Sequence, residues 1–306
     1  METDIVQPAR SVDLFLDSGA FSAFSQGITI DLDEYIQFIQ EHDRYLQVYA
    51  NLDVIGDPEA TWRNQQYMED RGLHPLPTFH YGEPIRYLER YVSIYPYVAL
   101  GGMVPIKTAD LRVWLDVLFS HYLCDERGLP RCKVHGFGLT TFDLMLRYPW
   151  YSVDSTSWVV TSRMGSIYIP RKRDGRWIYG ENAWKVCVSV RSPNVGVAGE
   201  HITTLRPAER ELMLSYIADK GYRLGRSRFE LRAMDSTLNE GERWAEKKGN
   251  GKKPTRLVEI IEEPGICNQY QLRDEMNILY FLDLERSLPD WPWVFKLKNS
   301  VKGLGL

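Results

Sequence analysis

The sequence predicts an α/β fold, a TIM-like (β/α)8 barrel that is either incomplete or atypically closed, followed by a basic α+β region. Up to residue 156, short apolar segments alternate with helical patterns at intervals of roughly 24 residues, the spacing of parallel strands joined by helical crossovers. The chain has 306 residues, and a barrel takes about 250. Beyond residue 156 the alternation ends and a basic segment follows.

Six short apolar runs are the predicted strands of the barrel part. They are Leu14–Asp17, Leu46–Asp53, Leu76–Tyr81, Tyr97–Gly102, Lys133–Gly138 and Tyr151–Asp154. The helical patterns between them cover 32–42, 58–71, 84–95, 108–124 and 140–148. Pro58 stands where a helix begins and Gly72 where it has ended, which is the usual placement of these residues.

The later part of the chain predicts a different arrangement. Ile167–Ile169 and Trp184–Val190 are expected strands, 206–220 and 272–288 expected helices, and 239–256 an expected mobile basic loop. We therefore expect three regions. Residues 1–158 form the main part of the catalytic barrel, 159–256 a basic docking region for nucleic acid that also contains candidate barrel strands, and 257–306 a helical region packing on the barrel.

Composition excludes several classes of protein. Hydrophobic residues make up 44% and charged residues 25%, which is typical of a globular chain and not of a disordered or collagenous one. No apolar stretch approaches the roughly 18 residues of a membrane span, and the polar, acidic N-terminus is unlike a secretory signal. We expect a cytoplasmic protein without a membrane partner; if the chain is phage-encoded, this is the bacterial host cytoplasm. The sequence indicates no oligomeric state.

Charge is divided unevenly along the chain. The net charge is −4, but residues 1–156 carry −10 and residues 157–306 carry +6, with +9 inside 157–256. Two interpretations remain open: two solvated surfaces of opposite sign, or an acidic catalytic part and a basic docking part. The four cysteines show no CxxC spacing, so we expect reduced thiols, no bound metal and no cofactor.

Polar residues and glycines cluster at the ends of the predicted strands. These ends read Asp17, Asp53, His80–Tyr81, Gly101–Gly102, His135–Gly136 and Asp154. The carboxyl ends of parallel strands meet at one mouth of a barrel, where catalytic residues lie. A single aspartate at such a place is usually a cap or turn residue. Three of them, with two histidines, favour a catalytic mouth.

The order of these segments resembles the tRNA-guanine transglycosylase superfamily. DSGAF (17–21) is similar to the DSGGF of that family, and FHYG (79–82), LGGM (100–103), HGFG (135–138) and VDSTSW (153–158) follow in the same order. The resemblance covers roughly residues 13–158. It is closest to the phage and genomic-island DNA 7-deazaguanine transglycosylases, through DSGAFS (17–22), GDPE (56–59), VDSTSW and the late segment 268–285.

The resemblance implies a pentosyltransferase. It would exchange guanine in DNA for a free 7-deazaguanine base, such as 7-cyano-7-deazaguanine, and release guanine through a covalent aspartyl intermediate. Asp154 matches the nucleophile at C1′, and Asp17 matches the acid/base residue. Asp53 matches the acceptor of the N1–H and 2-amino edge of the base. Carboxylates suit these roles because the transition state is oxocarbenium-like.

Other family positions imply contacts with the base. Gly102 matches a backbone N–H donor to O6, with Gly101 permitting that approach. His80 falls where the family often has a glutamine that contacts the base, and Phe21 and His135 fall where side chains sandwich the purine. Structural alternatives stay open for all five: hydrogen-bonded structural histidines, glycines required by packing, and a core phenylalanine.

The chain departs from the family pattern in two ways. The tRNA enzymes carry a CxCxxC zinc site after the nucleophile strand, and this chain has no such cysteines, which favours DNA over tRNA. The family barrel has two strands before the DSGGF strand, whereas twelve residues precede Asp13 here. The barrel is then either incomplete or closed by strands from beyond residue 157, for which Ile167–Ile169 and Trp184–Val190 are the candidates.

Basic clusters interleaved with aromatic residues predict contacts with nucleic acid. The residues expected to bind phosphate are Arg163, Arg171, Lys172, Arg173, Arg176, Arg226 and Arg228, with the lysines Lys247, Lys248, Lys252 and Lys253. Three other functions remain open: a tRNA-guanine transglycosylase without the zinc site (queuine- or archaeosine-type, queuosine-related), a non-catalytic barrel that binds nucleic acid or purine, and a nucleoside or glycoside hydrolase using two of the aspartates.

Overall fold

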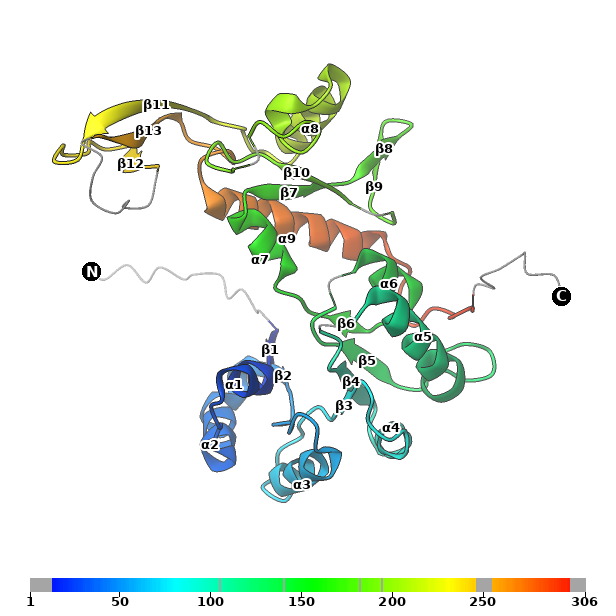
Figure 1. The fold of residues 1–306 in the computed structure, drawn as a ribbon. Helices are drawn as coiled ribbons and strands as arrows, with labels where there is room; N and C mark the ends of the chain where they lie inside the picture. The colour runs from blue at the N-terminus through cyan, green and yellow to red at the C-terminus, as the bar shows by residue number, and fades with distance from the viewer. Residues whose placement is uncertain are drawn as a thin grey trace, which may run out of the picture. The chain divides into compact units, whose positions relative to one another are not determined.

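A computed structural model describes residues 13–245 and 255–297, apart from Pro105, Thr140, Asn182 and Asn194. These residues form two compact units (Figure 1). The first takes in 13–154 and 290–297, and the second Ser155–Pro289. None of the described helices is long and apolar enough to cross a membrane.

The first unit contains six parallel strands in chain order. They are β1 (Leu14–Leu16), β2 (Leu46–Tyr49), β3 (Thr78–His80), β4 (Tyr97–Gly101), β5 (Lys133–Gly136) and β6 (Ser152–Val153). β1 pairs with β2, and β3 to β6 pair in succession. In the described pairings, a parallel bridge between Ala50 and Leu76 joins the two groups. The six predicted strands are confirmed, each shorter than expected.

Helices follow the strands, as expected for parallel β–α units. They are α1 (Ala20–Gln26), α2 (Leu32–His42), α3 (Pro58–Glu69), α4 (Arg86–Ile94), α5 (Thr108–Leu118, extended by a π-turn over Phe119–Leu123) and α6 (Phe142–Arg147). A short 3-10 turn (Asp43–Tyr45) follows α2. The five predicted helices are confirmed. The sequence pattern missed α1, because most of its seven residues are solvent-exposed and set up no apolar stripe.

A hydrophobic cluster beneath the first strands holds the nearby loops in place. Ile36 and Ile39 of α2 are buried together with Tyr49 of β2, with Met68 of α3 and with Leu52 in the loop between β2 and α3. The side chain of Asp57 caps α3 by accepting the N–H of Ala60 at 2.9 Å, so the GDPE segment is a helix start.

The parallel sheet is strongly curled. The ring of Phe15 on β1 stacks on His135 of β5, with 4.5 Å between ring centroids. In a flat sheet, four inter-strand steps of about 4.8 Å would hold these strands about 19 Å apart. Described pairings do not close the sheet on itself: the two expected closing segments, Ile167–Ile169 and Trp184–Val190, pair with each other in the second unit.

The second unit combines three helices with small antiparallel sheets. Its elements are α7 (Ser157–Arg163), β7 (Ser166–Ile169), β8 (Arg171–Arg173), β9 (Arg176–Ile178), β10 (Trp184–Cys187), a 3-10 turn (Ile202–Thr204), α8 (Pro207–Asp219), β11 (Arg226–Ala233), β12 (Glu242–Trp244), β13 (Thr255–Glu263) and α9 (Tyr270–Ser287). β7 pairs with β10, β8 with β9, and β13 lies between β11 and β12.

Two expectations for the second unit change. The expected loop 239–256 contains β12 and the first residues of β13, because Glu242, Arg243 and Trp244 pair with β13; residues 246–254 lie outside the described part. The C-terminal helix α9, expected as part of a separate region, packs on α7 and β7 in one unit with the basic segment. The buried Arg273 fixes it there by donating to the carbonyl of Ser162 at 2.7 Å.

Candidate active site

Asp17 and Asp154, predicted as catalytic, and Asp53, predicted to bind the base, lie close enough to influence one another electrostatically. Asp17 follows β1, Asp154 follows β6, and Asp53 lies in the loop after β2. The negative charge of Asp53 raises the pKa of Asp17, and the charge of Asp17 raises the pKa of Asp154. The curled sheet therefore brings together strand ends that are far apart in the sequence.

Asp17 and Asp154 both have a raised pKa, and the main cause is partial burial. Asp154 keeps 46% of its side chain exposed, yet the surrounding protein still displaces part of its hydration, which favours the neutral form. Backbone donors oppose the shift: Gly19 N–H lies 3.3 Å from Asp17 Oδ1, and Gly138 N–H lies 2.7 Å from Asp154 Oδ1. A raised pKa suits a group that must take up and release a proton.

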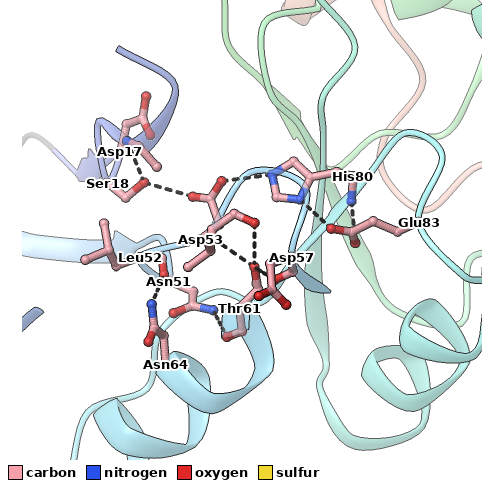
Figure 2. Close-up of polar contacts among 12 residues, drawn as sticks. Asp17, Ser18, Asn51, Leu52, Asp53, Asp57, Thr61, Asn64, His80 and Glu83 are labelled. Carbon is pink, nitrogen blue, oxygen red and sulfur yellow. Dashed lines mark hydrogen bonds and ion pairs between the residues drawn. The ribbon is translucent and has the colours of Figure 1, made fainter. Parts of the chain in front are cut away.

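Asp53 is held from two sides, as Figure 2 shows. Ser18 Oγ donates to Oδ1 at 3.0 Å, and His80 Nε2 lies 2.8 Å from Oδ2. The Asp53 side chain is only 10% exposed. An ionised carboxylate offers about four lone-pair sites. The Ser18 and His80 contacts fix the plane of the carboxylate and leave acceptor capacity on both oxygens for a ligand.

His80 is a buried cation between two carboxylates. Its Nδ1 lies 3.0 Å from Glu83 Oε1, and its backbone N–H donates to Glu83 Oε2 at 3.0 Å. Burial lowers the pKa of His80, but the hydrogen bonds to Asp53 and Glu83 outweigh it and raise the pKa to about 9. Both ring nitrogens are therefore engaged with protein. The structure places His80 on Asp53, whereas the sequence predicted a contact with the base.

Glu83 is a site residue that the sequence reasoning missed. Its side chain is 5% exposed, and its only sequence signal is its place three residues after His80 in FHYGE (79–83). A carboxylate that follows a histidine so closely can accept from both the ring and the backbone of that histidine. Glu83 thereby fixes the orientation of His80 and, through it, that of Asp53.

The loop that carries Asp53 is pinned to α3 (Figure 2). Asn51 Nδ2 donates to the carbonyl of Thr61 at 3.0 Å, and Asn64 Nδ2 donates to the carbonyl of Leu52 at 2.8 Å. One bond uses a backbone carbonyl of α3 and the other a backbone carbonyl of the loop. The Asp53 carboxylate points out of the loop (Figure 2). The loop is consequently a rigid support for this side chain.

Gly101 and Gly102 are required by close packing. A Cβ at Gly101 would lie 2.9 Å from His80 Cδ2. Gly102 has φ of +68°, and a Cβ there would lie 3.1 Å from the backbone N of Tyr81. The packing role that the sequence left open for both glycines is therefore present, because a side chain at either position would push against His80. The predicted N–H contact from Gly102 to a base stays a prediction.

His135 differs from its expected role in sandwiching the base. It is 2% exposed, Phe15 covers one ring face, and Phe137 packs edge-on at 4.4 Å. Its Nδ1 lies 2.6 Å from Ser152 Oγ, whereas its Nε2 is buried without a hydrogen-bond partner, 3.8 Å from Asp154 Oδ1. Burial lowers the pKa of His135 to about 3, so the ring is neutral.

Phe21 lies on α1, directly after the Asp17 segment, and its side chain is 55% exposed. A core role, which the sequence left open, is therefore wrong. The neighbouring Phe24 and Ile28 are also exposed, at 62% and 58%. An aromatic ring in this position is free to stack on a ligand.

The predicted phosphate contacts separate into two kinds. On the β8–β9 hairpin, Arg173 lies opposite Arg176, and Arg171 lies on the same face by strand alternation. The other face packs on α8, where Lys172 Nζ reaches Ser215 Oγ at 3.4 Å and Trp177 Nε1 donates to Asp219 at 2.9 Å. The outer face thus presents three exposed arginines, of which Arg173 also pairs with Glu181 at 2.7 Å.

The arginines of β11 are neutralised by acidic neighbours. Arg226 pairs with Glu262 and Glu263, at 3.0 Å each, and Arg228 pairs with Glu230 at 2.8 Å. Arg163 is exposed in the last turn of α7. The predicted contacts Lys247, Lys248, Lys252 and Lys253 lie outside the described residues.

Within the described part of the chain, no three His, Cys, Asp or Glu side chains are grouped to hold a metal ion. The four cysteines all fall in that part, and they are buried and free of disulfides. Comparisons of this chain with protein-family models, with curated proteins and with solved structures give no match.

Proposed function

We propose that this protein is a base-exchange transglycosylase that replaces guanine in DNA by a 7-deazaguanine derivative. The observation that supports it most directly is that three aspartates lie close enough together, at one end of the parallel strands, to influence one another electrostatically. Asp17 and Asp154 have raised pKa values, and Asp53 is clamped between Ser18 and His80. A raised pKa suits the proton transfers of Asp17, Asp154 attacks in its ionised form, and the fixed carboxylate of Asp53 suits base recognition.

The exchange proceeds in two displacements. Asp154 attacks C1′ of the target nucleoside, the glycosidic C–N bond breaks, and its electron pair leaves with guanine, which takes a proton from Asp17. The incoming base then gives a proton to Asp17 and attacks C1′. The C1′–oxygen bond breaks, and its electron pair returns to Asp154. The desolvation that raises the pKa of Asp17 supports its double use as acid and base.

Asp53 recognises the base in both displacements. Guanine and 7-deazaguanines share the N1–H and 2-amino donors, so one carboxylate in a fixed plane serves the leaving and the entering base. The clamp by Ser18 and His80 holds that plane before the ligand arrives, and such preorganisation reduces the cost of binding. Adenine presents a ring acceptor at N1 and has no 2-amino group, so this carboxylate rejects it.

Exposed arginines support a nucleic-acid polymer, and DNA is preferred to tRNA because the chain lacks the CxCxxC cysteines of the tRNA enzymes. The outer face of the β8–β9 hairpin presents Arg171, Arg173 and Arg176, which suits tracking of a phosphate backbone. The target guanine must leave the base stack before Asp154 can reach C1′. Transfer to tRNA uses the same guanine edge, and the assay below distinguishes the two polymers.

The decisive test uses DNA and tRNA that each carry labelled guanine, incubated separately with the protein and 7-cyano-7-deazaguanine. We expect release of label from DNA and a protein–DNA adduct that survives denaturation. Asp154→Ala should abolish both, whereas Asp110→Ala, at an exposed position in the first turn of α5, should change neither. Release from tRNA alone, or an adduct that persists in Asp154→Ala, would overturn the proposal.

The polymer contact has its own test. Arg171→Ala with Arg176→Ala should weaken DNA binding and reduce the slope of log K against log salt by about 2, one unit per lost phosphate contact. Arg226→Ala is the matched control, because its guanidinium already pairs with Glu262 and Glu263. If Arg226→Ala reduced DNA binding and its salt dependence as much as the hairpin substitutions do, the assignment of the phosphate contacts to the β8–β9 hairpin would be wrong.

A further inference from the structure

A buried nitrogen beside the proposed nucleophile has no partner. His135 Nε2 is enclosed by protein and makes no hydrogen bond. Leaving such a group unsatisfied costs about 1–3 kcal/mol, and buried polar groups in proteins are nearly always paired. The nearest acidic oxygen is Asp154 Oδ1, at 3.8 Å. This distance is about 1 Å longer than an N–H···O hydrogen bond.

A hydroxyl chain behind His135 favours a ring proton on Nε2. Tyr97 Oη lies 2.5 Å from Ser152 Oγ, which lies 2.6 Å from His135 Nδ1. If Tyr97 donates to Ser152, and Ser152 to Nδ1, every proton in the chain has an acceptor and the ring proton is on Nε2. The opposite direction would leave the phenol proton without an acceptor in this chain. Burial raises the pKa of Tyr97 to about 12, so the phenol keeps its proton.

The two oxygens of Asp154 are not equivalent. Oδ1 accepts the backbone N–H of Gly138 at 2.7 Å and faces His135 Nε2. Oδ1 is thus the anchored oxygen, and Oδ2 is the one placed to attack. In the covalent intermediate, Oδ2 is bonded to C1′ and Oδ1 becomes the carbonyl oxygen of the ester.

We infer that His135 donates a hydrogen bond from Nε2 to Asp154 Oδ1 as the carboxylate leaves C1′, and that Ser152 and Tyr97 position this donor. The inference rests on the proposed covalent mechanism. A donor stabilises the free carboxylate more than the neutral ester. In the oxocarbenium-like transition state Asp154 already carries most of its negative charge. The donor therefore stabilises the free carboxylate and the transition state about equally, which leaves the first displacement almost unchanged. It stabilises the transition state more than the ester, which speeds the second displacement, in which the C1′–oxygen bond breaks and charge returns to Asp154.

The test measures the two displacements separately. His135→Phe removes the donor and keeps an aromatic ring against Phe15, so adduct formation should stay within a few-fold of wild type. Resolution of the adduct by added base should slow about 10- to 100-fold, the effect of one hydrogen bond to a charged group. The adduct should then accumulate. His135→Gln, which retains a donor, should restore part of the rate. Phe137→Leu, which removes edge contacts with His135 and Phe15 but no hydrogen-bond donor, should leave the ratio of the two rates unchanged.

A second measurement does not depend on turnover. Nitrogen NMR of the histidine-labelled protein should show His135 as a neutral ring protonated on Nε2, and Ser152→Ala should change that tautomer. Equal slowing of both displacements in His135→Phe, or a proton on Nδ1, would overturn the role of His135 alone. If wild-type protein forms no adduct with DNA or tRNA, the proposed function fails even where the tautomer is as expected.

Discussion

His80 and His135 occupy two strands of the same sheet, β3 and β5, and are buried to a similar degree, at 6% and 2% exposure. Their charge states are opposite. His80 lies between Asp53 and Glu83, and its pKa is raised to about 9; His135 faces Phe15 and Ser152, and its pKa is lowered to about 3. Burial alone would neutralise both rings, so the neighbours decide the outcome.

Each histidine gives its aspartate a different character. The imidazolium of His80 fixes Asp53 by charge and hydrogen bonding, which suits a residue that reads a base and does not react. The neutral ring of His135 beside Asp154 adds no positive charge, and the pKa of Asp154 stays raised by partial burial. One end of the sheet thus holds a carboxylate fixed by a charged histidine and a second carboxylate beside a neutral histidine.

Removing the fixed carboxylate should have the largest effect. In the proposed function Asp53 accepts two hydrogen bonds from the base, each worth about 1.5–3 kcal/mol because the acceptor is charged, and Asp53→Ala deletes both. We expect kcat/KM for base exchange to fall by about 10² to 10⁴, measured by release of labelled guanine. A loss of less than tenfold would mean that Asp53 does not read the base.

The next substitution tests whether Glu83 supports the cation. Glu83→Gln keeps the size of the side chain but removes its charge, and the buried imidazolium loses one of two counter-ions. The free energy of unfolding at pH 7 should fall by about 1–3 kcal/mol, measured by chemical denaturation, and KM for the incoming base should rise. Glu89→Gln, at an exposed position on α4, is the matched control and should change neither quantity.

The two histidines should also affect stability on opposite sides of neutral pH. The raised pKa of His80 contributes stability that is complete below its unfolded value near 6.5 and is lost as pH rises through about 9. The lowered pKa of His135 contributes stability that is complete above about 6.5 and is lost as pH falls towards 3.

Each one-proton difference gives a slope of at most about 1.4 kcal/mol per pH unit. Unfolding free energies of wild type, His80→Gln and His135→Phe across pH 4–9 should show these slopes by subtraction. An alkaline slope that survives in His80→Gln, or an acid slope that survives in His135→Phe, would assign the titration to other groups.

We expect the smallest effect from Ser18, the uncharged one of the two residues that hold Asp53. Ser18→Ala removes the hydroxyl that donates to Asp53 Oδ1 and accepts the N–H of Ala20, and it leaves the His80 contact intact. We expect a loss of about 1 kcal/mol in unfolding free energy and a few-fold rise in KM for the base. If Ser18→Ala matched Glu83→Gln in both measurements, charge would not be the main component of the clamp.

Local patterns predicted much of the first unit. The alternation of apolar runs and helical patterns located β1 to β6, and Asp17, Asp53 and Asp154 were placed at strand ends because strand ends are local features. Glu83 could not be assigned, since nothing in FHYGE shows that the His80 ring turns towards it. The covered face of His135 depends on Phe15, 120 residues earlier, which only the curl of the sheet brings near.

The second unit was harder to predict because its pairing partners are distant. β11 reads as a basic segment, and its strand character depends on pairing with β13, where Glu262 and Glu263 neutralise Arg226. Charge counted along the sequence therefore overstated the cations available to DNA on β11. On the β8–β9 hairpin, alternation places three arginines on one face, but the contact of the other face with α8 is tertiary.

Among the described pairings, β2 and β3 are joined by a single bridge, between Ala50 and Leu76. We call this weakly paired boundary between the two strands the seam of the sheet. Asp53 comes from one side of this seam and His80 from the other. Their contact, called the latch below, therefore links the two sides by a side-chain hydrogen bond. The amides of Asn51 and Leu76 donate across the same seam, to Leu76 and Tyr49 at 2.9 and 2.8 Å. Their hydrogen–deuterium exchange rates consequently report on the latch, and a base seated on Asp53 should slow both.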